Sequence, residues 1–463
     1  MSNDISKYLR PETQKALSVL GFTQLTPIQA AAIPVALAGG DVVAQAKTGS
    51  GKTLAFALPI LNQLDASERK PKALVLCPTR ELAEQVAEQI RSAAQYISNV
   101  KVLTLCGGTP MPPQIASLSH GANIIVGTPG RVMDHLLKRR LDLSQVMHFV
   151  LDEADRMLDM GFADELNAVF ERLPDAAQTL LFSATFPDSV EQVVSDVTRS
   201  PSRVKGADET VALNITQQVY KIESHTRENA LKGLITDIQP ERCIVFCTTK
   251  KATQQVAQSL ASDGFAVVAL HGDLEQRERN DMLAMFSANC ARVLVATDVA
   301  ARGLDIDDVP LVINYQVSED ADTHIHRIGR TGRAGNTGVA ITLMAPDEEI
   351  FIARIEEVMN QTLPKKGAQN LRFHRNRIVL PSYTMLVLSG GKRDKLRPGD
   401  ILGSLTQDAG LPNEDIGKIK ITATHSHVAI KLRSVKRALQ FFRDGRVKGK
   451  RLRAKKVATI SAK

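Results

Sequence analysis

Short apolar runs recur along most of the chain and restrict its fold more than any other feature. Each run is rich in Val, Ile and Leu, ends at a polar, Gly or Pro turn, and is followed by a stretch of helical length. Such runs are typical of parallel strands with helices on both faces of the sheet. They form two sets, which predict two α/β domains joined near residues 206–214. The predicted strands are 41–46, 73–78, 123–129, 148–153 and 179–184, then 243–249, 266–272, 292–298, 311–315 and 338–344.

A shorter C-terminal unit has a different pattern. Its runs predict the order strand, helix, two strands, helix, strand. The predicted strands are 383–388, 416–422, 427–432 and 452–457, and the predicted helices are 397–411 and 434–442, the second capped by Ser434. The predicted organisation is a first domain at 1–208, a second at 212–364, a basic linker at 365–380 and a C-terminal domain at 381–463.

The charge of the chain is unevenly distributed. The formal net charge is +8, but residues 365–463 hold 24 of the 58 Lys and Arg and only 6 of the 50 Asp and Glu. This asymmetry indicates a C-terminal region that binds a polyanion. A solvated basic tail is the alternative. Apolar residues at Val447, Leu452 and Val457 interrupt the basic run and favour a folded strand.

Cysteine usage and the lack of long apolar segments predict a cytoplasmic protein. The five cysteines form no paired metal-ligand pattern, so we expect buried or free thiols in a reducing compartment. No apolar run is long enough to span a bilayer, and the first residues contain no apolar signal segment.

The segment "AKTGSGKT" follows the first predicted strand and opens a helix, which predicts a phosphate-binding loop. Its glycines let backbone amides surround phosphates, and the helix N-terminus adds positive potential. Lys52 would reach the β- and γ-phosphates of ATP, and Thr53 would bind Mg²⁺. The first position, usually Gly, is Ala46. The predicted nucleotide-binding residues of this loop are Ala46, Lys47, Thr48, Gly49, Ser50, Gly51, Lys52 and Thr53.

Two adjacent acids provide the partner that a phosphate loop needs. Asp152 and Glu153 stand where an apolar strand ends. Asp152 is expected to hold Mg²⁺, and Glu153 to orient and deprotonate the attacking water. Acids at a strand end alone are more often a cap or turn. Their occurrence with Lys52 and Thr53 in one α/β domain favours a nucleotide hydrolase.

A series of further motifs resembles the DEAD-box RNA helicases of superfamily 2. The resemblance implies two tandem RecA-like parallel-sheet domains, the P-loop helicase core, and ATP as the nucleotide. The motifs, in family order, are "GFTQLTPIQ" at 21–29, "PTRELA" at 78–83, "GG" at 107–108, "TPGR" at 128–131, "DEAD" at 152–155, "SAT" at 183–185, "ATDVAARGLD" at 296–305 and "HRIGRTGR" at 326–333.

The resemblance also implies roles for individual residues in ATP chemistry. Gln29 and Phe22 would contact adenine, and Asp305 the ribose. Arg330 and Arg333 would be arginine fingers that stabilise charge on the γ-phosphate. No acid stands among the three arginines of "HRIGRTGR", and we expect them to be unscreened by acids. Coupling between ATP and RNA is expected of Asp155, Ser183, Thr185 and His326.

RNA contacts implied by the resemblance run along phosphates and sugars and carry no sequence information. Because the fingers and the phosphate loop are on different domains, domain closure on RNA should stimulate ATP hydrolysis. The matching positions are Thr79, Arg80, Gly108, Thr128 and Arg131 in the first domain, and Gln276, Arg279 and Thr297 in the second.

The C-terminal unit resembles an RNA-recognition-motif fold, an α+β domain. Such domains stack bases on aromatic side chains in their first and third strands. This chain has Leu386 in the first and His425, His427 and Ile430 in or near the third. Basic side chains are therefore expected to carry the RNA binding. They are Lys392, Arg393, Lys395, Lys448, Lys450, Arg451 and Arg453.

The complete core followed by "GGKRDKLRPGDILGSLTQDAGLPNEDIGKI" is similar to the bacterial DbpA group of these helicases. That resemblance implies binding to a hairpin of 23S rRNA and a role on pre-50S particles during assembly of the large ribosomal subunit. An ATP-gated RNA clamp or chaperone with little strand separation is the alternative. A DNA helicase is disfavoured by the motif at 21–29 together with "DEAD".

Overall fold

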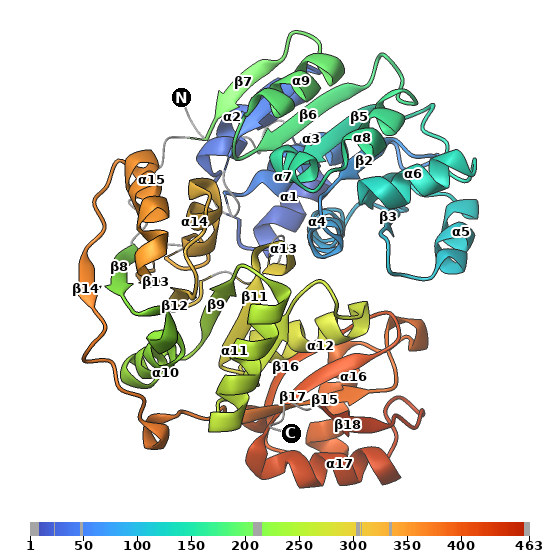
Figure 1. Ribbon diagram of the computed structural model, residues 1–463. Helices are drawn as coiled ribbons and strands as arrows, with labels where there is room; N and C mark the ends of the chain where they lie inside the picture. The colour runs from blue at the N-terminus through green and yellow to red at the C-terminus, as the bar shows by residue number, and fades with distance from the viewer. Residues whose placement is uncertain are drawn as a thin grey trace. The chain divides into compact units, whose positions relative to one another are not determined.

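The computed structural model describes residues 9–22, 24–46, 50–206, 215–301, 306, 308–332 and 336–457 (Figure 1). These residues belong to two compact units, the first ending at 206 and the second beginning at 215. The second unit contains two separate sheets. In the described part of the chain, no helix is long and apolar enough to cross a lipid bilayer.

The first unit is built on a seven-stranded parallel sheet, as the buried apolar runs predict. Its strand order is β3-β4-β2-β5-β6-β1-β7. The sequence did not reveal β3 and β7, the two edge strands, whose side chains are mostly partly or fully exposed. The strands are β1 Val42–Gln45, β2 Ala73–Leu76, β3 Val102–Leu105, β4 Ile124–Gly127, β5 His148–Asp152, β6 Gln178–Ser183 and β7 Ser202–Lys205.

Helices cover both faces of this sheet. One buried cluster joins residues of α2, α3 and α4 to one face, and another joins residues of α6 to α9 to the other. The helices are α1 Pro11–Val19, α2 Pro27–Leu37, α3 Lys52–Gln63, α4 Arg80–Ala93, α5 Met111–Ser119, α6 Pro129–Leu137, α7 Ala154–Asp159, α8 Ala163–Phe170 and α9 Asp188–Val197.

The second unit repeats this design. Its parallel sheet has the order β10-β11-β9-β12-β13-β8-β14. The strands are β8 Ile215–Lys221, β9 Cys243–Cys247, β10 Val267–Leu270, β11 Val293–Thr297, β12 Leu311–Asn314, β13 Gly338–Met344 and β14 Lys365–Gly367. The helices are α10 Arg227–Ile238, α11 Lys250–Asp263, α12 Gln276–Ser287, α13 Asp298–Ala301, α14 Ala321–Ile328 and α15 Glu349–Met359.

Residues 365–380, expected as a linker, lie along the second unit. β14 pairs with β8 as an edge strand, and the Phe373 ring stacks on Phe265 with centroids 5.9 Å apart. Arg377 forms an ion pair with Asp237 at 3.0 Å. The connector is therefore anchored before the C-terminal domain begins.

The C-terminal domain is a four-stranded antiparallel sheet of order β16-β17-β15-β18. This arrangement confirms the expected α+β fold. Its first helix is short and continues as a π-helical turn at 404–408. The elements are β15 Tyr383–Leu388, α16 Pro398–Gly403, β16 Ile416–Ile421, β17 Ser426–Lys431, α17 Val435–Asp444 and β18 Ala454–Lys456.

One expected cap is wrong. Ser434 precedes α17 but makes no side-chain capping bond. Its hydroxyl instead donates to Asp415 Oδ2 at 2.6 Å. Asp415 also accepts from Arg433 Nε at 2.8 Å, so it is the stronger acceptor that competes for the hydroxyl.

Candidate ATP and RNA sites

The phosphate loop, "DEAD" and "SAT" segments meet because their strands are neighbours. β1 pairs with β6, and β6 pairs with β5, all parallel. The carboxyl ends of these strands therefore lie at one edge of the sheet, the usual ligand edge of an open α/β fold. Asp152 and Ser183 are the last residues of β5 and β6, and Lys52 begins α3 after β1, so all three lie at this edge.

Gln29 ties the segment before the phosphate loop to the loop itself. Its Oε1 accepts from the Thr26 amide at 3.0 Å, and its Nε2 donates to the Gly51 carbonyl at 3.0 Å. Gly51 has φ of +90°, and a β-carbon there would lie 2.6 Å from Gln29 Nε2. Glycine is thus required both by backbone conformation and by close approach. Phe22, also expected at the adenine, is exposed.

Lys52, Asp152 and Glu153 are buried charged side chains at the end of the strands. Lys52 Nζ lies 3.6 Å from Asp152 Oδ1. Burial raises the pKa of Asp152, and the Lys52 charge partly offsets this. Glu153 has φ of +60°, a left-handed conformation that is costly for a residue other than glycine. Such conformations concentrate at functional sites.

The donor set fits a magnesium ion with a nucleotide phosphate. Within the described residues, Asp152 Oδ1 and Glu153 Oε2 are buried without a hydrogen-bond partner, and the nitrogens that pair with them, Lys52 Nζ and Arg156 Nε, are 3.6 Å away. Buried carboxylate oxygens in that state are unfavourable unless a ligand satisfies them. Carboxylate and hydroxyl oxygens suit Mg²⁺. Thr53, the second residue of α3, would supply the hydroxyl.

Asp155 binds the "SAT" segment directly. Its Oδ2 accepts hydrogen bonds from the Ala184 amide at 3.2 Å, the Thr185 amide at 2.9 Å and Thr185 Oγ1 at 3.0 Å. Its own amide donates to Ser183 Oγ at 3.2 Å. Burial alone would raise the pKa of Asp155, but the Thr185 hydrogen bonds, the Lys52 charge and the Arg156 amide together outweigh it and lower that pKa.

The RNA positions expected in the first unit also gather at one sheet edge. Thr79, Gly108 and Thr128 follow β2, β3 and β4, which are neighbours. Gly108 has φ of +68°, and a β-carbon there would overlap the Arg80 guanidinium. Arg131 Nη1 donates to the Thr109 carbonyl at 3.1 Å, next to Gly108.

In the second unit the expected RNA positions lie on α12 and at the end of β11. Gln276 and Arg279 belong to the first turns of α12. Arg279 Nη2 donates to the Ala300 carbonyl at 2.9 Å, and the Ala300 amide donates to Thr297 Oγ1 at 3.4 Å. These contacts link Arg279 to Thr297, and Gln276 lies three residues before Arg279 on α12.

The arginine segment differs from expectation at Arg327. This buried side chain binds Asp298 through Nε at 2.6 Å and Nη2 at 2.7 Å. The expectation that all three arginines lack acidic partners is therefore wrong. Asp298 is distant in sequence but lies directly after β11, where the fold brings it to α14. Arg330 is buried, and His326 is half-buried.

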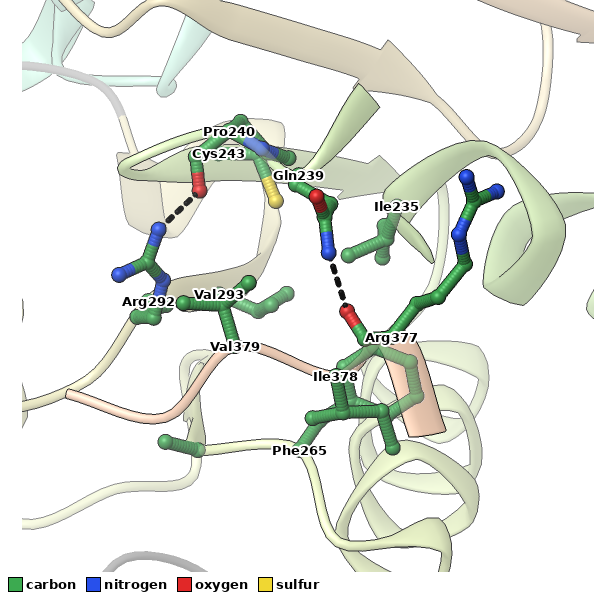
Figure 2. Close-up of a pocket in the computed structure, with 11 residues that line it drawn as sticks. Ile235, Gln239, Pro240, Cys243, Phe265, Arg292, Val293, Arg377, Ile378 and Val379 are labelled. Atoms are coloured by element: carbon green, nitrogen blue, oxygen red, sulfur yellow. Dashed lines mark hydrogen bonds between the residues drawn. The ribbon is translucent and has the colours of Figure 1, made fainter. Parts of the chain in front are cut away.

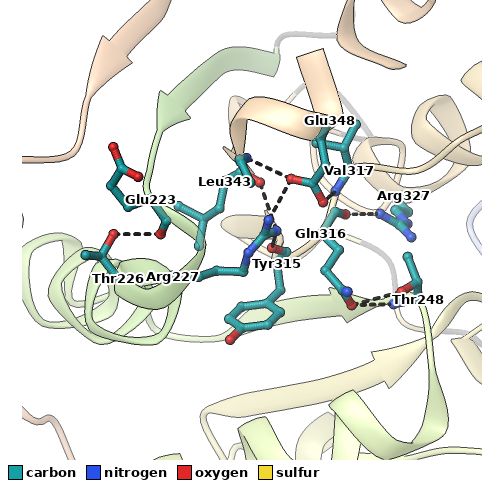
Figure 3. Close-up of polar contacts among 11 residues, drawn as sticks. Glu223, Thr226, Arg227, Thr248, Tyr315, Gln316, Val317, Arg327, Leu343 and Glu348 are labelled. Carbon is teal, nitrogen blue, oxygen red and sulfur yellow. Dashed lines mark hydrogen bonds and ion pairs between the residues drawn. The ribbon is translucent and has the colours of Figure 1, made fainter. Parts of the chain in front are cut away.

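Arg327 is also part of a network that sequence reasoning missed (Figure 3). Its Nη1 donates to the Gln316 carbonyl at 2.8 Å, and Gln316 Oε1 accepts from the Thr248 amide at 3.1 Å and its hydroxyl at 2.9 Å. The signal available was the Asp after "AT" in "ATDVAARGLD", an acid among buried apolar residues.

Two loops of the C-terminal domain bring the expected basic residues together. Lys450 Nζ lies 3.1 Å from Asp394 Oδ1, and Lys448 Nζ donates to the Lys395 carbonyl at 3.0 Å. The loops are therefore adjacent. We call them the basic loops, residues 391–397 and 446–453. The seven predicted residues Lys392, Arg393, Lys395, Lys448, Lys450, Arg451 and Arg453 are all exposed.

Five expected site residues lie outside the described residues. They are Lys47, Thr48, Gly49, Asp305 and Arg333. Their predicted roles remain predictions. The five cysteines are described, and all are buried free thiols, as expected: Cys77, Cys106, Cys243, Cys247 and Cys290.

Comparison with known proteins follows the same division of the chain. Residues 26–193 match the DEAD/DEAH box helicase family, residues 226–335 the helicase conserved C-terminal domain, and residues 385–456 the DbpA RNA binding domain. One match falls within each parallel-sheet domain, and the third falls within the antiparallel-sheet domain.

Two bacterial relatives match almost the whole chain. It is 46% identical over 452 residues to the ATP-dependent RNA helicase DbpA of Escherichia coli strain K12, covering 96% of this chain and 97% of that protein. It is 36% identical over 464 residues to the ATP-dependent RNA helicase DbpA of Bacillus subtilis strain 168, covering 96% of both.

Solved structures that resemble this chain include further RNA-bound proteins. S. cerevisiae Dbp5 bound to RNA and ADP BeF3 superposes with a TM-score of 0.72 at 30% identity, covering 80% of this chain and 97% of that one. Mss116p bound to ssRNA and AMP-PNP has a TM-score of 0.71 at 27% identity, covering 88% and 84%. The chain belongs to the DEAD-box ATP-dependent RNA helicases, in the DbpA group.

Proposed function

We propose that the phosphate loop and the "DEAD" acids of this helicase perform RNA-stimulated ATP hydrolysis with Mg²⁺. Lys52 binds the β- and γ-phosphates, Thr53 and Asp152 hold the magnesium ion, and Glu153 orients the attacking water and takes its proton. The bound ion would neutralise phosphate charge. Asp152 Oδ1 and Glu153 Oε2, which are buried and accept no hydrogen bond from the residues that the structure describes, support these roles.

Arg330 and Arg333 serve as the arginine fingers in this proposal. A guanidinium fork matches phosphate oxygens and stabilises the charge that develops during phosphoryl transfer. Arg330→Ala should retain ATP binding, measured with a fluorescent nucleotide, and reduce RNA-stimulated turnover by about 10³-fold. Wild-type turnover in this variant would contradict the assignment.

Asp155, Ser183, Thr185 and His326 couple nucleotide binding to RNA binding in the proposed mechanism. The hydrogen bonds between Asp155 and Thr185 support a mechanical link from the nucleotide edge to the segment after β6. The core RNA residues would grip the backbone of any RNA, because phosphate contacts do not discriminate among sequences.

We further propose that the C-terminal domain directs this activity to a hairpin of 23S rRNA during assembly of the large ribosomal subunit. There the enzyme would locally unwind or remodel short rRNA duplexes. The observation that carries the proposal is the pair of exposed basic loops in a domain that matches the DbpA RNA binding domain. A cytoplasmic location, as expected from the sequence, remains a prediction.

ATPase stimulation tests the target. The full-length protein should respond to much lower concentrations of a 23S rRNA fragment carrying the hairpin than of an unrelated hairpin of equal length. The double variant Arg451→Ala/Arg453→Ala should lose this preference and keep the response to unrelated RNA. Equal responses of the wild-type protein to both RNAs would contradict the proposed target.

The clamp alternative makes a different prediction in a strand-displacement assay. A helicase should release the short strand of a duplex joined to the hairpin when ATP is added. A protein that hydrolyses ATP on the same RNA without releasing the strand would be an ATP-gated clamp or chaperone.

A further inference from the structure

Two buried charged side chains hold the segment that follows β12, residues 315–317 (Figure 3). Arg227 Nη1 donates to the Tyr315 carbonyl at one end of this segment. Glu348 Oε1 accepts from the Val317 amide at the other end, at 3.3 Å. Arg227 Nη2 lies 2.7 Å from Glu348 Oε2, and the two side chains are 10% and 12% exposed. A single buried ion pair therefore holds both ends of the segment.

The same ion pair is fixed to the end of β13. Arg227 Nη1 also donates to the Leu343 carbonyl at 3.3 Å. Glu348 Oε2 accepts from the Ala345 amide at 2.8 Å. β13 is hydrogen-bonded to β12 on one side and to β8 on the other. Each buried charge thus has both an opposite charge and backbone partners, which a buried ion pair needs in order to be tolerated.

Helix α10, which begins at Arg227, is itself held at its far end. Its C-cap residue Gln239 donates through Nε2 to the Arg377 carbonyl of the connector at 2.8 Å (Figure 2). A β-carbon at Gly233, in the middle of this helix, would lie only 3.2 Å from the connector backbone at residues 371–372. The Arg227 guanidinium is therefore presented by a helix whose position is fixed by close packing.

The segment that the ion pair holds provides an acceptor for Arg327. Arg327 Nη1 donates to the Gln316 carbonyl at 2.8 Å, while its Nε and Nη2 bind Asp298. Gln316 is the middle residue of 315–317, so a shift of this segment would displace an acceptor of Arg327. Arg330 follows one turn later, and its amide donates to the Arg327 carbonyl at 3.2 Å. The position of Arg330 therefore depends on that of Arg327.

An arginine finger acts only where its guanidinium meets the phosphate oxygens on which charge develops. Misplacement of a catalytic group by about 1 Å can lower a rate about 100-fold, even when the mutation lies far from the chemistry. ATP binding is proposed for the phosphate loop and the "DEAD" acids, which belong to the first unit. A defect in the position of a finger should therefore lower kcat and spare ATP affinity.

We propose that the Arg227–Glu348 ion pair positions the arginine finger Arg330. The pair holds residues 315–317 and, through the Gln316 carbonyl and Arg327, the turn that carries the finger. Arg227 and Glu348 act through other residues and are therefore positioning residues. This inference rests on the proposed role of Arg330 in ATP hydrolysis.

The test compares full-length Arg227→Met and Glu348→Gln with the wild-type protein. Glu348→Gln keeps the size of the side chain but has one acceptor oxygen where the carboxylate has two, and it provides a second variant should Arg227→Met not fold. At saturating RNA, each variant should lower kcat about tenfold and keep the Kd of a fluorescent ATP analogue within about twofold. Unchanged kcat in both variants, or a loss confined to ATP affinity, would overturn the positioning role.

Lys232→Met is the matched control on the same helix. Lys232 is also a buried charge, with a side chain 8% exposed, and it pairs with Glu228 at 2.6 Å and Asp263 at 2.7 Å. These partners belong to α10 and α11, and neither is part of the segment that holds Arg327. The control should lower the thermal unfolding temperature and keep wild-type kcat. An equal loss of kcat in Lys232→Met would indicate general damage to the domain and would overturn the proposal.

A double variant shows whether the ion pair acts through the finger. In single-turnover assays, Arg227→Met/Arg330→Ala should be no slower than Arg330→Ala, because residues that act through one another are not additive. A further loss of about tenfold in the double variant would overturn this route.

The same assays separate this inference from the proposed function. Wild-type turnover in Arg330→Ala would overturn the finger role, and this inference with it. A large loss in Arg330→Ala, together with wild-type kcat in Arg227→Met and Glu348→Gln, would leave the finger role intact and overturn the positioning role alone.

Discussion

At the scale of single residues, the nucleotide site depends on one close approach between backbone and side chain. Gln29 donates to the Gly51 carbonyl, and Gly51 adopts φ of +90° at the start of α3. The sequence contains both residues in recognisable motifs. Their direct contact is a property of the fold, which places α2 beside α3.

Gly51→Ala should weaken ATP binding at least tenfold. A β-carbon would force Gln29 out of place and would disfavour the left-handed backbone by about 1–2 kcal/mol. Gly39→Ala is the matched control, because Gly39 has φ of +85° but no atom within 4 Å of the added carbon. Nucleotide titration should show weaker ATP affinity for Gly51→Ala and wild-type affinity for Gly39→Ala. Equal ATP affinities in the two variants would contradict this account.

Asp155→Asn should destabilise the first unit by about 2 kcal/mol at pH 7, because an amide group would replace the acceptor of three hydrogen bonds. The folded state lowers the pKa of Asp155. Its contribution is therefore complete above the unfolded pKa of about 3.9 and is lost as pH falls through the lower folded value. Thermal unfolding should show the gap between wild type and variant narrowing at acid pH; a gap that widens would contradict this.

At the scale of elements, strand prediction failed at several strands with little apolar signal, and it also missed β3, which has the apolar sequence VLTL. β7 and β14 are mostly exposed edge strands, and β8 mixes polar and apolar residues. These strands are held by backbone hydrogen bonds to their neighbours: β7 to β1, β8 to β13 and β14 to β8. An edge strand needs no continuous apolar run, because one side of it has no neighbour.

Asp415 joins two elements of the C-terminal domain, and its contacts predict an order of variant stabilities. It accepts hydrogen bonds from Arg433 and Ser434 beside α17, and these hold its pKa well below the ordinary range. Asp415→Asn should lower the unfolding temperature of this domain more than Ser434→Ala, since it weakens both contacts. Calorimetry of the full-length variants would decide, and a larger effect of Ser434→Ala would contradict the assignment.

At the scale of the whole molecule, the excess of positive charge lies in the C-terminal region and not in the domain that holds the phosphate loop. The basic C-terminal region contrasts with an otherwise acidic chain. The affinity for the hairpin should therefore depend mainly on counterion release at the basic C-terminal region.

The salt dependence of hairpin binding tests this separation. Arg453→Ala should reduce the slope of log affinity against log salt by roughly 1, as expected for one lost phosphate contact. Lys436→Ala removes one positive charge from the exposed surface of α17, away from the basic loops, and should leave the slope unchanged. Equal slopes for the two variants would contradict a binding surface centred on the basic loops.

The sequence by itself determined the two parallel-sheet domains, the α+β C-terminal domain and the family, because buried strands and phosphate-binding turns restrict residue type locally. Only the tertiary structure decided which distant residues pair. Asp298 with Arg327, and Asp281 with His427, are contacts between segments far apart in the chain. Their charges could be satisfied by many partners, and only the packing of strands and helices selects one.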